Sequence, residues 1–186
     1  MRCVPWQWLT LAGVVVAVLA GCPSGQPDDN DNDGPNNNGT PGTIWQPAPG
    51  TSFDWILSEQ APATTSVEAI DVDGFDTTAA EVAALHAQGV KVIAYISVGT
   101  VENWRSDADD FPASIVGNKY QGWAGERWLD IRDINALGPV LEARLDMIQA
   151  KGFDAIEPDN IDGFEAVNTG FALAESDAED FCLWLA

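Results

Sequence analysis

The chain has 186 residues, of which 46% are hydrophobic, and this length suits one domain with a substantial core. Its 29 acidic and 8 basic residues give a formal net charge of -21. Nucleic acid is therefore not an expected partner, because binding to a phosphate backbone requires the opposite charge. A neutral or cationic ligand is compatible with this charge.

Residues 1–21 have the pattern of a targeting segment. Arg2 supplies a positive charge, and the apolar run Leu9–Leu19 that follows is short for a membrane-spanning helix. Residues 19–22, Leu-Ala-Gly-Cys, then resemble the bacterial lipobox, at which the signal is cut before a cysteine that carries the lipid. We therefore expect an exported protein that a lipid on Cys22 anchors to the bacterial membrane or cell surface. The alternative is an ordinary secretory signal with an incidental cysteine.

The segment at residues 22–43 contains, after its cysteine, only Pro, Gly, Asp, Asn, Ser and Thr with a single Gln. Such a segment has nothing to bury, so we predict a disordered linker. Within it, Asp29–Gly34 matches the first half of a calcium-binding loop. The twelfth position would be Thr40 rather than a bidentate glutamate, which favours a solvated spacer. The folded domain is expected to occupy residues 44–186.

Strand-like and helix-like patterns alternate along the predicted domain. Short apolar runs indicate strands, and apolar residues three or four apart indicate helices. This alternation favours a parallel sheet built from βα units. The predicted strands are 53–57, 67–72, 90–96, 128–131 and one that begins at Phe153. The predicted helices are one capped by Thr77 or Thr78 that ends at Gly89, one at 136–150 that Gly152 closes, and one that begins at Asp177. A tryptophan-rich loop region is predicted at 101–128.

Acidic side chains gather where the predicted strands end. The clearest group is Glu157, Asp159 and Asp162, after the strand that begins at Phe153. We expect this strand to stop near Pro158, because proline cannot donate to a ladder. The carboxyl ends of strands carry the active site in an α/β barrel, and like charges this close raise each other's pKa. The alternative is an acidic loop that only caps the next helix.

Two further groups of acids extend this pattern. Asp71, Asp73 and Asp76 follow the second predicted strand, and Glu102 and Asp107 come after the third. A ring of strand-end carboxylates on a barrel is typical of a glycosidase. Tryptophans offer flat faces that suit sugar rings, although core packing is the alternative for each. They are Trp45, Trp55, Trp104, Trp123 and Trp128.

Other chemistries lack the necessary residues. The only histidine, His86, falls within a predicted helix, which argues against a Ser-His-Asp triad. Cys182 has apolar neighbours and is expected to be buried, so one histidine and one usable cysteine disfavour a zinc site. No Gly-rich phosphate loop opens a predicted helix. We therefore expect neither a metal nor a cofactor.

A series of short blocks carries a family resemblance. The blocks are Ile44–Pro47, Trp55–Leu57, Asp71–Asp76, Ala94–Gly99, Glu102–Asp107, Gly125–Arg132 and Phe153–Asp162. In this order they resemble family 114 of the glycoside hydrolases, the endo-α-1,4-polygalactosaminidase-like proteins. The resemblance runs from about Ile44 to Ala186, which makes it more specific than any single motif.

This resemblance implies a fold and a function. The fold would be a (β/α)8 TIM barrel, of which this chain is the N-terminal part, truncated after about the fourth βα unit. The function would be hydrolysis of an α-1,4-linked galactosamine-containing polysaccharide through two carboxylates. A partly deacetylated galactosamine polymer is cationic, which agrees with the negative charge of the chain. The alternative is a surface lipoprotein that binds polysaccharide without cleaving it.

The resemblance also implies roles for individual residues. The family's first catalytic carboxylate, at the end of the fourth strand, falls on Asp159, and the second is a glutamate on a later strand, beyond Ala186. We predict that Asp159 is nucleophile or general base, because it lies nearer the mouth than Glu157, which would support and tune it. The predicted substrate-binding residues are Asp71, Asp73, Tyr95, Trp55, Arg105 and Asp162.

The substitution Cys22→Ala tests the predicted anchor. Without the thiol no lipid can be attached, so the protein should leave the membrane fraction or remain unprocessed. Cell fractionation followed by mass determination measures both outcomes. Unchanged membrane partitioning of a normally cleaved protein would contradict the prediction.

The predicted domain, residues 44–186 expressed alone, is expected to be inactive on galactosamine polymers and to aggregate or fold loosely. Its predicted strands are too few to close a barrel, and the second carboxylate is missing. Phe181, Leu183 and Trp184 are expected to add to an exposed apolar patch. Gel filtration, thermal melting and reducing-end assays test this. A monomer that melts cooperatively and cleaves the polymer would overturn the prediction.

Overall fold

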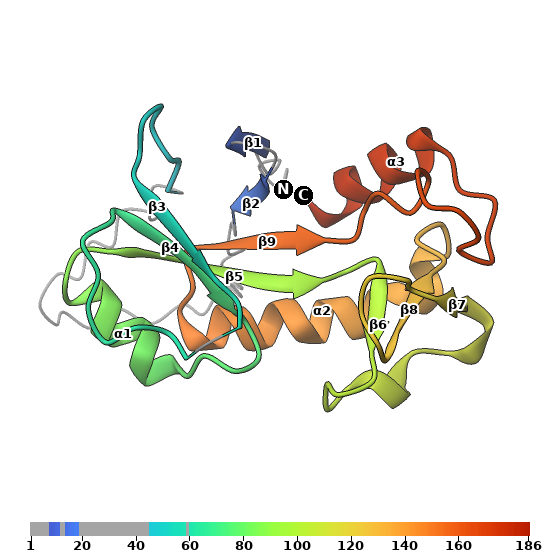
Figure 1. Cartoon of the computed structure of the whole chain (residues 1–186), viewed down its shortest axis with the longest axis horizontal. Coiled ribbons are helices and arrows are strands. Elements are labelled where there is room, and N and C mark those ends of the chain that lie inside the picture. The colour runs from blue at the N-terminus through green and yellow to red at the C-terminus, as the bar shows by residue number, and fades with distance from the viewer. Residues whose placement is uncertain (1–7, 12–13, 19–44, 59) are drawn as a thin grey trace, which may run out of the picture.

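The computed structural model describes residues 8–11, 14–18, 45–58 and 60–186. Within these residues lie a six-stranded sheet in the order β1-β2-β9-β5-β4-β3 and a three-stranded sheet in the order β6-β8-β7 (Figure 1). Both Cys22 and the whole predicted linker fall outside the described residues.

The bounds of the elements are as follows. The larger sheet contains β1 Trp8–Leu11, β2 Val14–Val18, β3 Phe53–Ile56, β4 Ala69–Asp73, β5 Lys91–Ser97 and β9 Ala155–Asp159. The smaller sheet contains β6 Thr100–Glu102, β7 Val116–Lys119 and β8 Glu126–Leu129. The helices are α1 Ala79–His86, α2 Ile134–Lys151 and α3 Glu175–Leu185, with 3-10 turns at Ala108–Asp110 and Ala113–Ile115.

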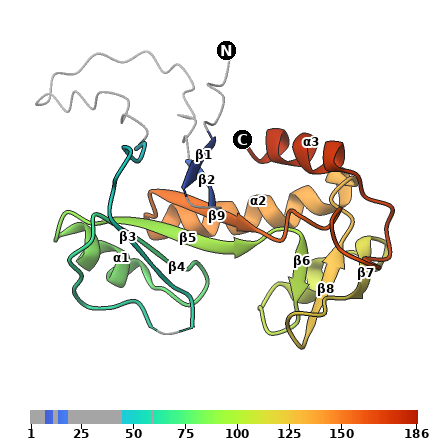
Figure 2. The same cartoon turned by 45° about the horizontal axis from the view of Figure 1, so that its top comes forward.

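Four neighbouring strands, β3, β4, β5 and β9, pair in parallel and form the centre of the molecule. Side chains alternate between the two faces of such a sheet. One face, which includes Val72, Ala94 and Ile156, packs in the main core with Leu85 of α1 and Leu141 of α2 (Figures 1 and 2). The predicted parallel α/β arrangement is therefore confirmed.

The two helices between the parallel strands begin and end at residues that suit those positions. Thr78 caps α1 in a reciprocal pair with Glu81, whose carboxylate accepts the backbone N–H of Thr78 (2.8 Å). The α2 helix begins two residues before its predicted start, where the Asp133 side chain accepts the N–H of Ala136. It ends at Gly152, which has the left-handed φ of 91° that glycine adopts readily.

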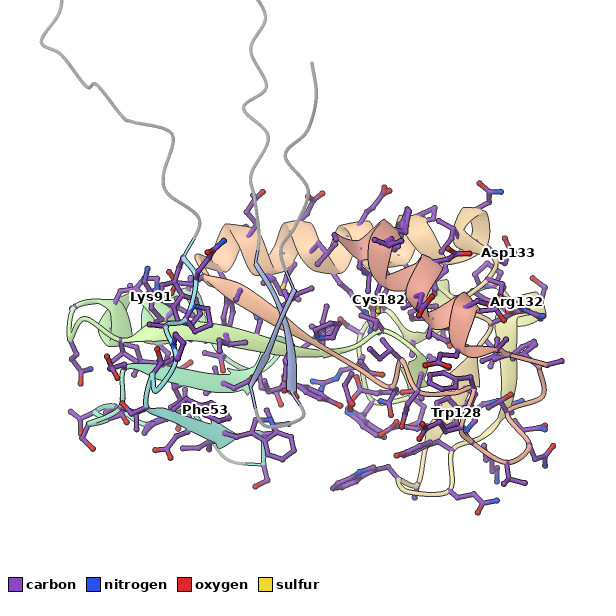
Figure 3. All side chains as sticks on the ribbon, turned by 90° about the horizontal axis from the view of Figure 1, so that it is seen from above. Phe53, Lys91, Trp128, Arg132, Asp133 and Cys182 are labelled. Carbon is purple, nitrogen blue, oxygen red and sulfur yellow. The ribbon has the colours of Figure 1, made fainter. Side chains whose placement is uncertain are left out.

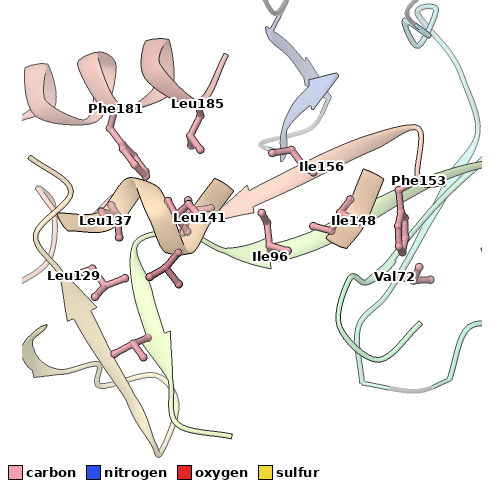
Figure 4. Packing of buried hydrophobic residues seen from close by; sticks show 14 of the residues in the cluster. Val72, Ile96, Leu129, Leu137, Leu141, Ile148, Phe153, Ile156, Phe181 and Leu185 are labelled. Carbon is pink, nitrogen blue, oxygen red and sulfur yellow. The ribbon is translucent and has the colours of Figure 1, made fainter. Parts of the chain in front are cut away.

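The α3 helix adds its apolar face to the same core. Figure 4 shows Phe181 and Leu185 directed toward α2, near Leu137 and Leu141. The predicted exposure of Phe181 is wrong, because its ring is only 1% exposed. Leu183 does stand out into solvent. Cys182, which we expected to be buried, is only partly so.

The loop prediction for residues 101–128 is also wrong in part. The segment contains β7 and parts of β6 and β8, and their sheet lies beyond the carboxyl ends of β5 and β9 (Figures 1 and 2). These strands have only three or four residues, and the sequence of β7 is Val-Gly-Asn-Lys. Such short, polar strands show no clear alternation, which is the signal that strand prediction requires.

The strand β9 continues one residue past its expected end at Pro158. The carbonyl oxygen of Asp159 accepts the N–H of Val98 (3.1 Å), so the backbone polar groups of residue 159 face β5. The backbone polar groups of Pro158 must therefore face the other edge of β9, the edge that pairs with β2. That pairing involves only Ala155 and Ile156 of β9, so it does not reach Pro158. A proline fits there because no donor is needed.

The hairpin of β1 and β2 comes from the predicted targeting segment, residues 1–21. The two strands are antiparallel, and Ala17 and Val18 of β2 pair with β9. Export and processing of this segment stay predictions. Across the described ranges, no helix combines the length and the apolar character that crossing a membrane requires.

The end of β9 approaches the turn after β5 closely at Gly99. A Cβ atom on Gly99 would overlap the carbonyl oxygen of Asn160. Asn160 itself has a left-handed φ of 63°, which asparagine tolerates better than most residues. The absence of a side chain at position 99 therefore allows the backbone of Asn160 to pack directly against the turn after β5.

The substitution Gly99→Ala tests this contact. The added methyl must push the two backbones apart, so we expect the free energy of unfolding to fall by about 1–3 kcal/mol. Gly89→Ala is the control, because a Cβ there meets nothing within 4 Å and only the positive φ of 82° is unfavourable. The control should lose about 1–2 kcal/mol, the cost of the left-handed conformation alone, and less than Gly99→Ala. Urea denaturation of the complete protein measures both, and equal losses would contradict the contact.

Candidate active site

The sheet face that points away from α1 and α2 carries polar side chains at the carboxyl ends of its strands. The register aligns Asp73, Tyr95 and Glu157 across three strands, and it places Ser97 next to Asp159 one step further on. Toward the other end of the strands this face becomes apolar, with Ala69, Ile93 and Ala155 packed against Trp45 and Phe53. Figure 3 shows Phe53 and Trp128 near opposite ends of the molecule. The acidic groups thus gather at the carboxyl ends of the parallel strands, which are called the mouth below.

Asp159 is the last residue of β9 and lies at this mouth. Its Oδ2 accepts hydrogen bonds from the Tyr95 hydroxyl (2.7 Å) and from Nδ2 of Asn160 (3.1 Å). Burial and the Asp159 carboxylate raise the pKa of Tyr95, so the phenol remains a donor at neutral pH. Among the described residues, no side chain or backbone group bonds to Oδ1 of Asp159. One fixed oxygen and one available oxygen suit a nucleophile or a general base.

Glu157 and Asp71 form a buried acidic pair beside it. Oε2 of Glu157 accepts a hydrogen bond from Nε1 of Trp55 (3.0 Å). Asp71 is fully buried, and no donor among the described residues reaches either of its oxygens. Burial, followed by the charge of Glu157, raises the pKa of Asp71 well above its ordinary value. Burial also raises the pKa of Glu157, although Asp71 and Trp55 oppose this rise.

A proton on one of these two carboxyl groups removes the repulsion between Asp71 and Glu157. Two ionised carboxylates can only accept hydrogen bonds and repel each other, whereas a protonated Asp71 can donate to Glu157. We therefore assign the proton to Asp71 and the negative charge to Glu157 at neutral pH. The Trp55 N–H supports that charge.

A buried arginine neutralises the next acids. Nη1 and Nη2 of Arg105 donate to the two oxygens of Asp73 (3.0 and 2.6 Å), and Nε donates to Glu102 (2.9 Å). Asp73 also accepts the backbone N–H groups of Phe75 and Asp76 (both 2.9 Å). Burial lowers the pKa of Arg105, but the hydrogen bonds that it donates to the carboxylates of Asp73 and Glu102 outweigh burial and raise this pKa. Asp73 and Arg105, both predicted to bind substrate, thus have their polar atoms engaged within the protein.

A hydrogen-bonded network lies behind Asp159. Nδ2 of Asn160 contacts the hydroxyl of Ser97 (3.0 Å) and that of Thr100 (3.3 Å), as well as Asp159. The two hydroxyls are 2.6 Å apart, and Thr100 donates to Oε2 of Glu126 (2.8 Å). Sequence reasoning did not select Asn160, Thr100 or Glu126, because their contacts join strands of two sheets. Only the position of Asn160 next to Asp159 could have indicated it.

The predicted sugar-binding tryptophans differ in exposure, and Trp55 is the one that contacts a carboxylate of the site, Glu157. Trp55, Trp104 and Trp123 are 58%, 49% and 67% exposed. Trp128 is buried and packs edge-on against Tyr120, as the core alternative predicts. Asp162 is exposed on the loop after β9, and burial, together with Asp159, Asp162 and Glu126, raises the pKa of Tyr120. Tyr120 therefore lies among the acids, although sequence reasoning did not select it.

A cleft of about 590 Å³ lies elsewhere, along α2 on the helix-covered side of the sheet. Its lining includes Phe75, Asp107, Arg144 and Met147. Asp107, one of the acids expected in the ring, forms a two-pronged ion pair there with Arg144 (2.7 and 3.0 Å). The cleft holds none of the carboxylates on the opposite face, so the chemistry of the side chains locates the site better than the volume does. In the part of the chain that the structure describes, no group of three or more His, Cys, Asp or Glu residues is arranged to hold a metal ion.

Comparisons with known proteins identify a family and similar folds. The model of glycoside-hydrolase family GH114 matches residues 34–186. The crystal structure of Aspergillus fumigatus Ega3 in complex with galactosamine is similar, with 37% sequence identity and a TM-score of 0.73. The glycoside hydrolase domain of PelA from Pseudomonas aeruginosa has a similar fold, with 19% identity and a TM-score of 0.54. A comparison with curated protein sequences gave no match.

The matches cover most of this chain but only part of each of the two solved structures. The Ega3 match covers 81% of this chain and 59% of that chain, and the PelA match covers 70% of this chain and 50% of that chain. This chain therefore spans somewhat more than half of Ega3 and half of the PelA domain. The family match extends over most of the chain and confirms the resemblance predicted from the sequence blocks. The chain belongs to glycoside-hydrolase family GH114.

Proposed function

We propose that the protein containing this chain hydrolyses an α-1,4-linked galactosamine-containing polysaccharide, with Asp159 as one of two catalytic carboxylates. The observation that carries the proposal is the position of Asp159 at the end of β9, with Oδ2 held by Tyr95 and Asn160. Membership of the family supports glycosidase chemistry. The galactosamine bound to Ega3 supports the class of sugar.

The geometry suggests how Asp159 would act. The two donors hold Oδ2 and leave Oδ1 to attack a sugar carbon or to accept a proton from water. Glycosidases of this kind pass through an oxocarbenium-like transition state, and nearby negative charge, here that of Glu157, would stabilise its positive charge. The family resemblance puts the second carboxylate, a glutamate, on a strand later than β9.

The charge around the site favours a cationic polymer. Glu157 and Asp159 lie on one face of the sheet, while the nearby cation Arg105 is already paired with Asp73 and Glu102. A polymer with free amino groups would be attracted to such a surface, and exposed Trp55 would offer a face for a sugar ring. We also propose export and lipid attachment at Cys22, on the strength of the apolar run and the lipobox-like residues before it.

The substitution Asp159→Asn tests the catalytic assignment in the complete protein. Removal of a reacting carboxylate should lower kcat on a partly deacetylated α-1,4-galactosamine polymer by roughly 1,000-fold or more. Asp146→Asn, on the exposed side of α2, is the matched control and should leave kcat unchanged. Released reducing ends measure turnover.

The pattern across variants separates the alternatives. If Glu157→Gln abolishes turnover and Asp159→Asn does not, the roles of the two residues are reversed. If neither substitution matters, the site is wrong. If the complete wild-type protein binds the polymer without releasing reducing ends, the binding lipoprotein becomes the better description.

The pH dependence of stability tests the proton assigned to Asp71. The folded state retains this proton, while the unfolded chain releases it above about pH 4, so stability should fall as pH rises from there toward the raised folded pKa. Asp71→Asn has no proton to release. Urea denaturation should show a smaller loss of stability between pH 5 and pH 8 in Asp71→Asn than in wild type. Identical pH dependence would contradict the assignment, and Asp146→Asn again serves as control.

A further inference from the structure

Glu126 occupies an unfavourable position that its own contacts do not compensate. It lies directly opposite Glu102 across the β6–β8 pair, and the two residues are only 4% and 3% exposed. Like charges in opposite positions on paired strands destabilise a sheet. Arg105 compensates Glu102, whereas the carboxylate of Glu126 accepts only the Thr100 hydroxyl among the described residues. A buried carboxylate in such a place calls for a role.

A series of hydrogen bonds connects Glu126 with Asp159. Thr100 donates to Glu126 (2.8 Å), and its Oγ1 is 2.6 Å from the Ser97 hydroxyl. Nδ2 of Asn160 donates to Ser97 (3.0 Å) and to Oδ2 of Asp159 (3.1 Å). This series, Glu126, Thr100, Ser97, Asn160 and Asp159, is called the relay below.

The charge on Glu126 determines which way the Thr100 hydroxyl points, and this leaves Oγ1 of Thr100 (2.6 Å) as an acceptor for Ser97 beside the Thr100 carbonyl oxygen (3.2 Å). An ionised carboxylate can only accept, so the single proton of Thr100 must point to Glu126. Thr100 then accepts from Ser97, and Ser97 accepts from Asn160. The amide of Asn160 faces the hydroxyls and Asp159 with its NH2 group, an orientation that the Asp159 carboxylate also requires.

We propose that Glu126 is a positioning residue that fixes the donor direction of the relay and thereby holds Oδ2 of Asp159 in place. The proposal rests on the proposed function of Asp159, because its effect is exerted on that carboxylate. Glu126 does not contact substrate in this scheme. Its buried position in the β6–β8 sheet couples that sheet to the end of β9.

The scheme has a consequence for pH. Burial, Glu102 and Asp159 raise the pKa of Glu126, while the bond from Thr100 and the charge of Arg105 oppose this. A protonated Glu126 can donate to Thr100 and reverse the relay, so turnover should decline at a less acidic pH than for an ordinary glutamate. The titratable and charged groups around Glu126 are Glu102, Arg105, Asp159, Tyr95 and Tyr120.

The substitution Glu126→Gln in the complete protein tests the proposal, because the amide matches the carboxylate in shape but can donate to Thr100. We expect kcat on the partly deacetylated galactosamine polymer to fall about 10-fold, the lower range for loss of a group behind a reacting residue. KM should stay within about twofold, since no substrate contact is lost. Glu126→Asp keeps the charge and should recover part of kcat. Exposed Glu142→Gln is the matched control.

The pH profile and a second variant separate positioning from mere stability. The acid limb of the kcat profile should move to lower pH in Glu126→Gln and stay in place in Glu142→Gln. Thr100→Val removes the next hydroxyl of the relay and keeps the shape of the side chain, so it should lower kcat by a similar factor. The double variant Glu126→Gln/Thr100→Val should have a kcat only slightly lower than that of either single variant. If Glu126→Gln does not fold, Thr100→Val and the acid limb of the wild-type profile still decide the question.

Each failure has a distinct signature. An inactive Asp159→Asn together with wild-type kcat and an unchanged pH profile in Glu126→Gln would overturn the relay alone. A fully active Asp159→Asn would overturn the proposed function as well. A fall in melting temperature of Glu126→Gln with unchanged kcat for the folded fraction would show that Glu126 has only a structural role.

Discussion

The parallel pairing of β4, β5 and β9 is the constraint on which the site depends. Its register brings Asp73, Tyr95 and Glu157 to one level and Ser97 with Asp159 to the next. Because side chains alternate along each strand, all of these groups share one face, while α1 and α2 cover the other. A shift of one residue in any of these pairs would turn an acid into the apolar core.

Concentrating so many carboxylates on one face is unfavourable, and the chain compensates each of them differently. Arg105 pairs with Asp73 and Glu102, Trp55 and a proton on Asp71 satisfy Glu157, and hydrogen-bond donors alone serve Asp159. Buried acids without such partners would be protonated or would destabilise the fold. Asp159 differs from Asp73 and Glu102 because no cation pairs with it, and from Glu157 because no neighbouring carboxyl group donates a proton to it. That difference, more than its position alone, is the reason why we propose Asp159 as the reacting group.

The sequence predicted the features that arise from local pattern. Apolar runs located the parallel strands, and Gly152 and one of the two candidate caps, Thr78, marked helix ends. The strand-end acids Asp73, Glu157 and Asp159 do lie at one end of the sheet, as predicted. The short strands of the smaller sheet were missed because three or four residues carry no periodic signal. Glu126, Thr100 and Tyr120 were missed because their relation to Asp159 is made entirely by tertiary contacts. Phe181 was misjudged because the apolar surface of α2 that covers it cannot be seen in its own helix.

The most direct measurement is a crystal structure of the complete protein, carrying Asp159→Asn, with a bound galactosamine oligomer. The account predicts that the anomeric carbon at the bond to be cleaved lies about 3–3.5 Å from the side chain of residue 159, the separation of a reactive pair. The oligomer should extend over the face of the sheet that carries Glu157 and Trp55. An oligomer bound only in the cleft along α2, with residue 159 free of any sugar, would contradict the central claim.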